Sequence, residues 1–311
     1  MEKSTILQVK DMKITFSQYT KGLRRKKLTV INGLDLELQK GEILAVVGSS
    51  GSGKSLLAHA LLGILPDNAA LEGEIYYRDQ ILGQWEKERI RGRELVLIPQ
   101  SVTYLDPLQK VGEQIGLSVK HKGDRRKTAE QLLLRYGLEP ETADCYPFQL
   151  SGGMARKVLL ATALAAEPEV IIADEPTPGL DEEALGEVLK DFRRLADQGC
   201  SLLMITHDIE AALKIADRVA VFYGGTVLET AKTADFAQGG RGLRHPYTRA
   251  LNQARPGEGF EAISGTQPYG DQLPTGCLFA PRCLKKTAVC EKEKPLLREL
   301  RGGKVRCNHA T

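Results

Sequence analysis

Apolar and polar residues alternate near the start of the chain, as they do in strands that place one face in a core. Residues 6–16 (ILQVKDMKITF) alternate, and residues 34–38 (LDLEL) do so strictly. Residues 43–47 (ILAVV) are apolar without interruption, run into a loop of Gly and Ser, and precede a helical pattern over 55–65. This order predicts half-exposed antiparallel strands, followed by a buried central strand that leads into a helix.

Four more uninterrupted apolar runs follow along the chain. Helical segments separate several of them, which indicates an α/β fold with a largely parallel sheet. The runs are 95–99 (LVLIP), 170–173 (VIIA), 202–205 (LLMI) and 218–222 (RVAVF). Charged helical patterns replace the strand-like runs after residue 101, for example at 125–136, and we expect an α-helical insertion at about 101–160.

The composition changes near residue 240. Clustered glycines at 239–242 and a Pro- and Gly-rich stretch at 256–276 indicate a connector. Beyond it lie four of the six cysteines, namely Cys277, Cys283, Cys290 and Cys307. We therefore predict a core domain over 1–240 and a small Cys-rich extension over 241–311.

The charge balance excludes several classes of protein. The 43 Lys and Arg residues nearly balance the 40 Asp and Glu residues, which is unlike a disordered chain or a polybasic nucleic-acid-binding one. No apolar run approaches the roughly 18 residues of a membrane span. The opening MEKSTILQVKDMK lacks the apolar segment of a signal peptide, which predicts a cytoplasmic protein without structural disulfides. We interpret the basic run 21–27 (KGLRRKK) as a solvated loop between two strands.

Residues 48–55 (GSSGSGKS) fit the phosphate-loop pattern G-x-x-x-x-G-K-[ST]. A chance glycine-rich turn is the alternative, but the apolar strand before the loop and the helix after it are both in place. Backbone N–H groups and the helix dipole would hold phosphate, while Lys54 neutralises the β and γ phosphates and the Ser55 hydroxyl ligates Mg²⁺. The candidate nucleotide-binding residues are Gly48, Ser49, Ser50, Gly51, Ser52, Gly53, Lys54 and Ser55.

Polar residues follow three other predicted strands. Asp174 is placed to hold Mg²⁺ through water, and Glu175 to accept a proton from the water that attacks the γ-phosphate. Helix capping is the alternative for this pair, but prolines follow immediately. His207 is a candidate to contact the γ-phosphate and orient that water, with capping of the next helix as the alternative. Gln100, ambiguous alone, is a candidate Mg²⁺ ligand that links the core to the insertion.

A second anion site precedes a helical pattern at 155–165. Residues 150–154 (LSGGM) place a Ser and two Gly at that helix N-terminus, which is superfluous in a monomer that already has a phosphate loop. The site makes sense if it closes over the nucleotide of another subunit. With this segment the whole chain resembles the ATP-binding subunit of an ABC transporter. The motifs that carry the resemblance occur in the family's order: the phosphate loop, Gln100, LSGGM, VIIADEPT, the loop 179–181 (GLD) and His207.

The resemblance implies a P-loop NTPase fold, the ABC cassette, with a RecA-like α/β core, an antiparallel β subdomain and an α-helical insertion. It implies a head-to-tail dimer in which Ser151, Gly152 and Gly153 of one subunit cover the ATP on the other's phosphate loop. It also places Phe16, or as second choice Tyr19, against adenine, although Phe16 could equally be a core residue. The chain departs from the usual pattern with MARK after the signature and PTPGLD in place of PTTALD. Neither change affects groups that touch phosphate, so we expect an active ATPase.

The extension resembles the C-terminal region of the oligopeptide, dipeptide and nickel importer subfamily, through residues 244–251 (RHPYTRAL) and 276–283 (GCLFAPRC). In that subfamily the four cysteines match the ligands of a [4Fe-4S] cluster. Their spacing, C-x5-C-x6-C-x16-C, departs from zinc patterns built on C-x-x-C pairs. Zinc and unligated thiols remain the alternatives, and only the resemblance favours iron–sulfur.

The resemblance implies an importer ATPase at the cytoplasmic face of the cell membrane. Its expected partners are a homologous ATPase subunit, identical or not, two membrane permease subunits and, indirectly, an extracytoplasmic substrate-binding protein. Peptide uptake is the expected function, and nickel or metal-chelate uptake the alternative, because the ATPase never touches the cargo. A soluble ABC ATPase of DNA repair or translation is disfavoured, since the chain has one cassette, no heptad run and no basic stripe. We expect the permease to contact residues 100–112, where Leu105 and Pro107 suggest an apolar surface.

Overall fold

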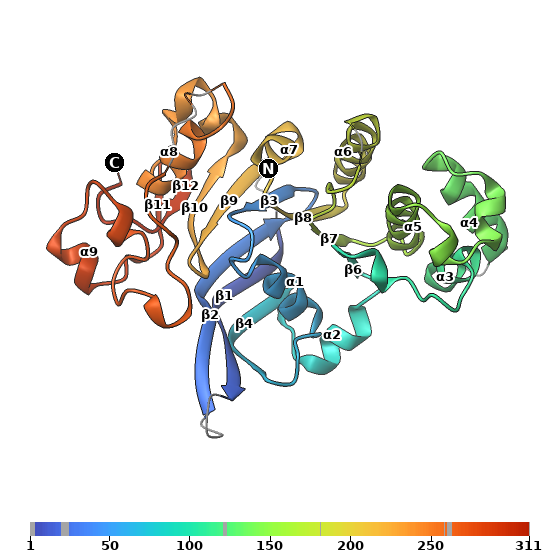
Figure 1. The fold of residues 1–311 in the computed structure, drawn as a ribbon, viewed down its shortest axis with the longest axis horizontal. Helices are drawn as coiled ribbons and strands as arrows, with labels where there is room; N and C mark the ends of the chain where they lie inside the picture. The colour runs from blue at the N-terminus through green and yellow to red at the C-terminus, as the bar shows by residue number, and fades with distance from the viewer. Residues whose placement is uncertain are drawn as a thin grey trace.

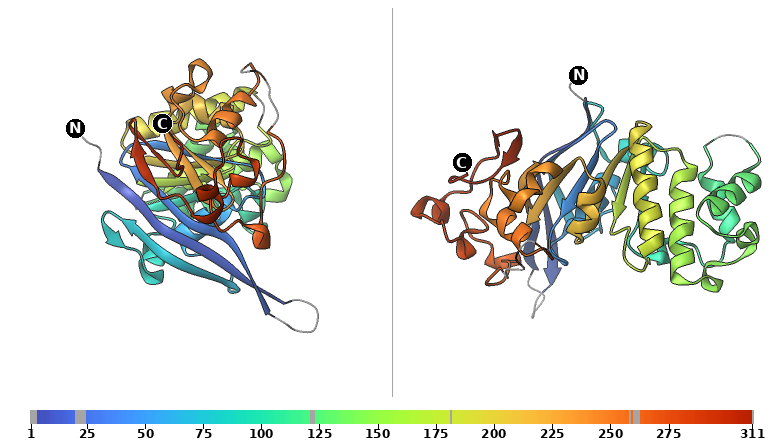
Figure 2. Two further views of the ribbon diagram at one scale, coloured as in Figure 1. Left: turned by 90° about the vertical axis from the view of Figure 1, so that its left-hand side faces the viewer. Right: turned by 90° about the horizontal axis from the view of Figure 1, so that it is seen from above.

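The computed structural model describes residues 4–19, 25–120, 123–180, 182–257, 259 and 263–310. The basic run 21–27 and the loop 179–181 lie partly outside these ranges. The helical insertion and the C-terminal extension lie at opposite ends of a central sheet, and the hairpin of the two longest strands projects from one side (Figure 1). The view from above in Figure 2 shows the same order along the molecule.

The central sheet has the strand order β11-β12-β10-β9-β3-β8-β7-β6. Its strands are β3 (Ile43–Val47), β6 (Leu95–Ile98), β7 (Val170–Asp174), β8 (Ser201–Thr206), β9 (Arg218–Tyr223), β10 (Thr226–Lys232), β11 (Arg298–Leu300) and β12 (Gly303–Val305). The pairings from β6 to β9 are parallel, and those from β9 through β10 and β12 to β11 are antiparallel. All residues of β3 are buried, which confirms the prediction of a buried central strand.

A smaller antiparallel sheet has the order β2-β1-β4-β5. Its strands are β1 (Thr5–Tyr19), β2 (Arg25–Gln39), β4 (Ala69–Tyr77) and β5 (Gln80–Ile81). Leu34, Leu36 and Leu38 of β2 are all buried, so the strict alternation over these residues marks the face that packs on the core. The two predicted antiparallel strands are therefore confirmed, and both are longer than the alternating stretches.

Nine α-helices and several 3₁₀ turns complete the described part of the chain. The helices are α1 (Lys54–Leu62), α2 (Gln84–Ile90), α3 (Val111–Ser118), α4 (Arg125–Arg135), α5 (Gly152–Ala165), α6 (Glu182–Asp197), α7 (Ile209–Ile215), α8 (Pro246–Gln253) and α9 (Ala288–Lys292). The 3₁₀ turns include η2 (Val102–Tyr104) and η7 (Gly270–Gln272). None of the described helices is both long and apolar enough to span a bilayer.

The insertion contains α3, α4 and α5, which pack against one another. Helix α5 begins earlier than the predicted 155–165, because the Ser151 hydroxyl accepts a hydrogen bond from the Met154 N–H at 3.3 Å and caps it. Leu105, expected on the surface, is buried in the main core, so that expectation is wrong. The segment turns inward there, whereas Pro107, the other residue of that expectation, is exposed, as are the large apolar residues Val102, Tyr104 and Leu108.

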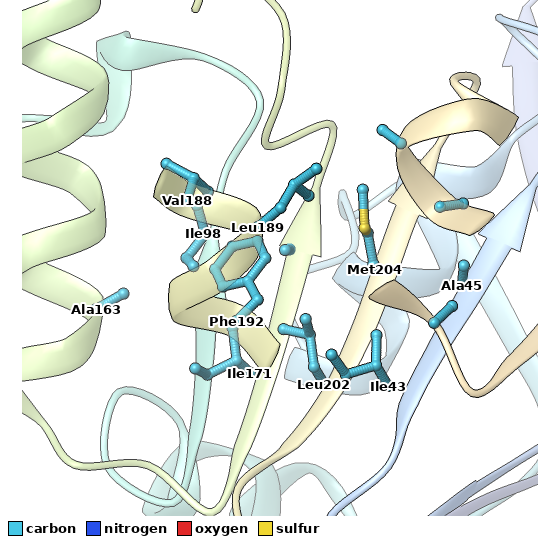
Figure 3. Close-up of a cluster of buried hydrophobic side chains, with 14 of the residues drawn as sticks. Ile43, Ala45, Ile98, Ala163, Ile171, Val188, Leu189, Phe192, Leu202 and Met204 are labelled. Atoms are coloured by element: carbon cyan, nitrogen blue, oxygen red, sulfur yellow. The ribbon is translucent and has the colours of Figure 1, made fainter. Parts of the chain in front are cut away.

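Helix α6 covers one face of the sheet through Phe192, which is 1% exposed and lies among Ile171 of β7 and Leu202 of β8 (Figure 3). Burying a side chain of this size stabilises the fold by on the order of 2 kcal/mol. This packing fixes β7 and β8 side by side. Their carboxyl ends, with that of β3, form the edge at which the candidate residues lie.

The C-terminal extension adds strands to the central sheet. Strand β12 pairs with β10, with Glu229 opposite Val305, and Lys304 makes a 2.7 Å ion pair with Glu37 of β2. Phe279 belongs to the main hydrophobic core. The sheet therefore continues across the division that we predict near residue 240.

Candidate active site

The candidate residues meet at the carboxyl ends of three neighbouring parallel strands. Strand β3 leads into the phosphate loop. Strand β7 ends at Asp174, which Glu175 follows, and β8 ends directly before His207. Ligands of open α/β sheets bind at this edge. A pocket of about 400 Å³ lies here, lined by Phe16, Gln18, Leu28, Val30, Ser50, Gly51, Gly53, Lys54, Ser55, Leu56, Gln100, Glu175 and Tyr269.

The phosphate loop wraps around its own lysine. The Lys54 ammonium donates hydrogen bonds to the carbonyl oxygens of Gly48 and Ser49, both at 2.9 Å. Burial lowers the pKa of Lys54, although the charge of Glu175 opposes this effect. Gly53, which caps α1, has φ 98°, a conformation that favours glycine. The loop thus surrounds the buried Lys54 ammonium with a curved backbone. This arrangement is suited to binding a phosphate group.

Asp174 is buried beside the phosphate loop. Its Oδ1 atom has no hydrogen-bond partner among the described residues. Burial raises the pKa of Asp174, while a hydrogen bond to Ser55 and the charges of His59 and Lys54 oppose the shift. A buried carboxylate oxygen without a partner, next to a serine hydroxyl, is the donor set that a hard divalent cation prefers.

Glu175 is held in an unusual backbone conformation, with φ 48°, and its N–H donates to the Ile205 carbonyl at 2.8 Å. Its Oε2 atom accepts a hydrogen bond from the Thr206 hydroxyl at 3.2 Å and lies 2.9 Å from Nδ1 of His207. Its Oε1 atom lies 4.0 Å from the Lys54 ammonium. The His207 side chain is 56% exposed and is not among the residues that line the pocket; it adjoins the pocket through its contact with Glu175.

Arg156 of α5 is a buried cation that the sequence analysis did not single out. One of its terminal nitrogens, Nη1, donates to the carbonyl oxygens of Pro99 (2.8 Å) and Gln100 (2.7 Å). The other, Nη2, donates to those of Glu175 (3.1 Å) and Pro178 (3.4 Å). The Arg156 side chain therefore connects helix α5, which begins within the LSGGM segment, to the backbone of Gln100 and Glu175.

The structure places Phe16 and Gln100 in the pocket wall, whereas Tyr19 is 64% exposed and is not among the lining residues. The segment 151–153 is not among them either. A Cβ atom added at Gly152 or Gly153 would meet no described atom within 4 Å, so this helix end faces open space. Within one chain, the second anion site therefore lies apart from the pocket of the phosphate loop.

The four cysteines of the extension line one small cavity, together with His245. The His309 N–H donates to Sγ of Cys307 at 3.4 Å. Burial raises the pKa of Cys277 to about 11, so that thiol is neutral at pH 7. Among the described residues, no group of three or more His, Cys, Asp or Glu is arranged to hold a metal ion.

Comparison with known proteins agrees with this geometry. The ABC transporter family profile matches residues 31–178, and the profile for the C-terminal region of oligopeptide/dipeptide transporters matches residues 228–290. The chain is 36% identical to the oligopeptide transport ATP-binding protein AppD of Bacillus subtilis, over 98% of this chain and 96% of that protein. The chain belongs to the ABC transporter family.

A second relative and a solved structure support this assignment. The dipeptide transport ATP-binding protein DppD of Haemophilus influenzae is 33% identical over 97% of this chain and 95% of that protein. A solved dimer of an ATP-binding cassette in a post-hydrolysis state, bound to ADP and phosphate, superposes with a TM-score of 0.64 at 28% identity, covering 73% of this chain and 99% of that one. The ABC cassette fold predicted from the resemblance is therefore confirmed.

Proposed function

We propose that this chain is the ATP-hydrolysing subunit of an importer that takes up oligopeptides or dipeptides through a membrane permease. The observation that carries the proposal is the pocket lined by Lys54 and Glu175, with His207 in contact with Glu175 and the buried carboxylate of Asp174 beside Lys54. The relatives reported above are named for oligopeptide and dipeptide transport, which favours peptide over nickel as the cargo.

The residues of the pocket divide the work of hydrolysis. The phosphate loop holds the β and γ phosphates, with the Lys54 ammonium released from its own backbone to pair with them. Ser55 and Asp174 would hold Mg²⁺, with Gln100 next to it; the ion supplies charge neutralisation for the phosphates. Glu175 accepts the proton of the attacking water, and His207, in contact with Oε2 of Glu175, orients that carboxylate and the γ-phosphate.

A second ATPase subunit, the same or homologous, would complete the site. Ser151 and the two glycines after it face open space at the start of α5, so they are available to cover a nucleotide on the partner. The dimeric state of the solved cassette described above supports this arrangement. Arg156 would then carry the effect of closure from α5 to the backbone of Gln100 and Glu175.

The permease would dock on the segment that contains η2. Its exposed apolar side chains are Val102, Tyr104 and Leu108, the last 85% exposed, and this segment begins directly after Gln100. An amphipathic helix of the permease could place apolar residues against them. Contact here would place the chain at the inner surface of the membrane and link the permease to the nucleotide site.

We also propose that the four cysteines hold a [4Fe-4S] cluster. Two observations support this fit. All four thiols line one cavity. In addition, His245 lines the same cavity, is 1% exposed, and leaves its Nε2 atom without a hydrogen-bond partner, while its Nδ1 accepts from the Tyr247 N–H. A buried Nε2–H donor beside four thiols is suited to a sulfur acceptor. The role of the cluster would be structural.

Transport by the reconstituted complex tests the proposed function. This chain, its partner ATPase, the two permeases and the binding protein are incorporated into vesicles, and ATP-dependent uptake of a labelled dipeptide and tripeptide is measured with nickel as a comparison cargo. We expect peptide uptake that is lost when Lys54→Ala is introduced into this chain. Nickel uptake without peptide uptake, or peptide uptake unchanged by Lys54→Ala, would contradict the proposal.

A further inference from the structure

The C-terminal extension reaches the nucleotide pocket. Tyr269, in the connector that precedes the cysteines, is one of the residues that line the pocket, together with Phe16 and Lys54. The neighbouring Gln267 accepts a 2.8 Å hydrogen bond from the hydroxyl of Ser49, which lies in the phosphate loop 218 positions earlier in the chain. Two parts of the chain that the composition assigns to different units therefore share one pocket.

The connector is seated closely against the pocket wall. The turn η7 packs on β2, which is visible where the orange-red connector passes β2 in Figure 1. Gly270 makes the closest approach, since a Cβ atom added there would lie 2.6 Å from Cδ1 of Leu28. Gly270 also has φ 59°, so a larger residue would meet both a clash and backbone strain. This seating places the preceding residue, Tyr269, at the pocket.

The pocket has a polar end and an apolar end. Lys54, Ser55 and Glu175 form the polar end, where the triphosphate belongs. Phe16 and Leu28 contribute apolar surface, which suits a planar base, and Tyr269 is the further aromatic residue in the lining. Tyr269 is half exposed and lines the pocket, so its ring is accessible to a ligand there.

We propose that Tyr269 binds the base of the nucleotide, and that the hydrogen bond between Gln267 and Ser49 holds it in place. The inference rests on the proposed ATP site and assigns to the extension a direct part in that site. A nucleotide base between Phe16 and Tyr269 would contact both the β1–β2 hairpin and the connector. Loss of the connector would then weaken nucleotide binding even though every phosphate-binding residue is intact.

Competition binding with the full-length protein tests this inference. The dissociation constants of ATP and of inorganic tripolyphosphate are measured by displacement of a fluorescent ATP analogue. Tyr269→Ala should weaken ATP binding about fivefold to tenfold, the usual contribution of one aromatic stacking contact. Tripolyphosphate has no base, so its affinity should be unchanged. Tyr269→Phe should bind ATP as the wild type does, and Gln267→Ala should give a smaller loss that is also specific to ATP.

Trp85→Ala is the control, because Trp85 is an exposed aromatic residue (65%) that does not line the pocket. Unchanged ATP affinity in Tyr269→Ala would overturn the inference, as would an equal loss for ATP and tripolyphosphate, which would mean a distorted phosphate loop. Unchanged affinity in Gln267→Ala would overturn the part assigned to that hydrogen bond. Failure of the wild-type protein to bind ATP would instead contradict the proposed function.

Discussion

Oε2 of Glu175 lies 2.9 Å from Nδ1 of His207, at the ends of two adjacent parallel strands. The same oxygen accepts a hydrogen bond from the Thr206 hydroxyl, so these two contacts hold the Oε2 side of the carboxylate. Its Oε1 atom faces Lys54. A carboxylate oriented in this way can take a proton from a water molecule without first losing rotational freedom. In the proposed function the two residues have different tasks, Glu175 as the base and His207 as the group that orients it.

Glu175→Gln should abolish most hydrolysis and leave ATP binding intact. The amide keeps the size of the side chain but cannot accept the proton, and loss of a general base costs about 100-fold or more in rate. Phosphate release by the complex with its permease measures the rate, and binding of a fluorescent ATP analogue measures affinity. Hydrolysis at the wild-type rate would refute the assignment of Glu175 as the base.

Phe16→Ala should weaken ATP binding, whereas Tyr19→Ala should not. Phe16 lines the pocket, while Tyr19 lies further along β1 and is not among the lining residues. The expected loss for Phe16→Ala is about fivefold in affinity. Equilibrium binding of a fluorescent ATP analogue to the two variants compares two aromatic residues of the same strand. A larger loss in Tyr19→Ala would show that the second choice is the residue that contacts adenine.

Arg156→Ala should destabilise the protein by about 3 kcal/mol, because it leaves four carbonyl oxygens without their charged donor in a buried setting. Urea unfolding measures the change. Lys157→Ala is the control, since it removes a neighbouring cation of the same helix that is only half buried. Equal stability of the two variants would mean that the hydrogen bonds of Arg156 do not hold this region together.

The Glu37–Lys304 pair should make part of the stability depend on pH. Burial raises the pKa of Glu37, but the hydrogen bond and charge of Lys304, the hydrogen bond of Gln8 and the charge of Arg218 together outweigh it, so the pKa is lowered. The pair's contribution is therefore complete above about pH 4.5 and is lost as the pH falls through the lowered pKa. Since both side chains are partly exposed, we expect a contribution of no more than about 1 kcal/mol.

Comparing the wild type with Glu37→Gln across pH tests this effect. The difference in free energy of unfolding should be positive at pH 7 and should shrink toward pH 3 as the carboxylate of the wild type is protonated. Lys304→Met should reduce the same pH-dependent difference, because it deletes the partner that lowers the pKa of Glu37 most. A difference between wild type and Glu37→Gln that stays constant over this range would contradict the prediction.

Protein purified without oxygen should show the broad visible absorbance of thiolate-to-iron charge transfer, and Cys290→Ser should lose it. Cys145→Ser and Cys200→Ser are matched controls, because neither residue lines the cavity of the four cysteines. Iron and acid-labile sulfide are determined on the same samples, together with zinc. Zinc without iron would favour the alternative metal, and the absence of both would mean that the four thiols are unligated.

The parallel strands and the phosphate loop could be predicted from the sequence, because burial on both faces leaves an unbroken apolar run, as at 43–47, and because the loop motif has one structural context. The strands β11 and β12 could not. Each has three residues, too few to show a period of two, and their pairing with β10 depends on the path of the connector. The continuation of the sheet beyond residue 240 is thus a feature of the tertiary structure that composition does not reveal.

The candidate site could be predicted where polar residues stand at the end of a strand, as Asp174, Glu175 and His207 do. It was not predictable at Arg156 or Tyr269. A cation near the start of a helix is ordinarily solvated, and only the three-dimensional structure shows that Arg156 points into the protein. Tyr269 lies in a Pro- and Gly-rich connector whose pattern carries no information about which surface it touches.

The short hairpin of β11 and β12 protects this chain against aggregation through an exposed strand edge. Strand β10 has seven residues, and without β12 its outer N–H and C=O groups would be open to any extended peptide. Each hairpin strand has only three residues, so the rim left to solvent is a poor template for further pairing. A chain cut at residue 240 would expose β10 and would be prone to aggregate, whatever the state of its catalytic residues.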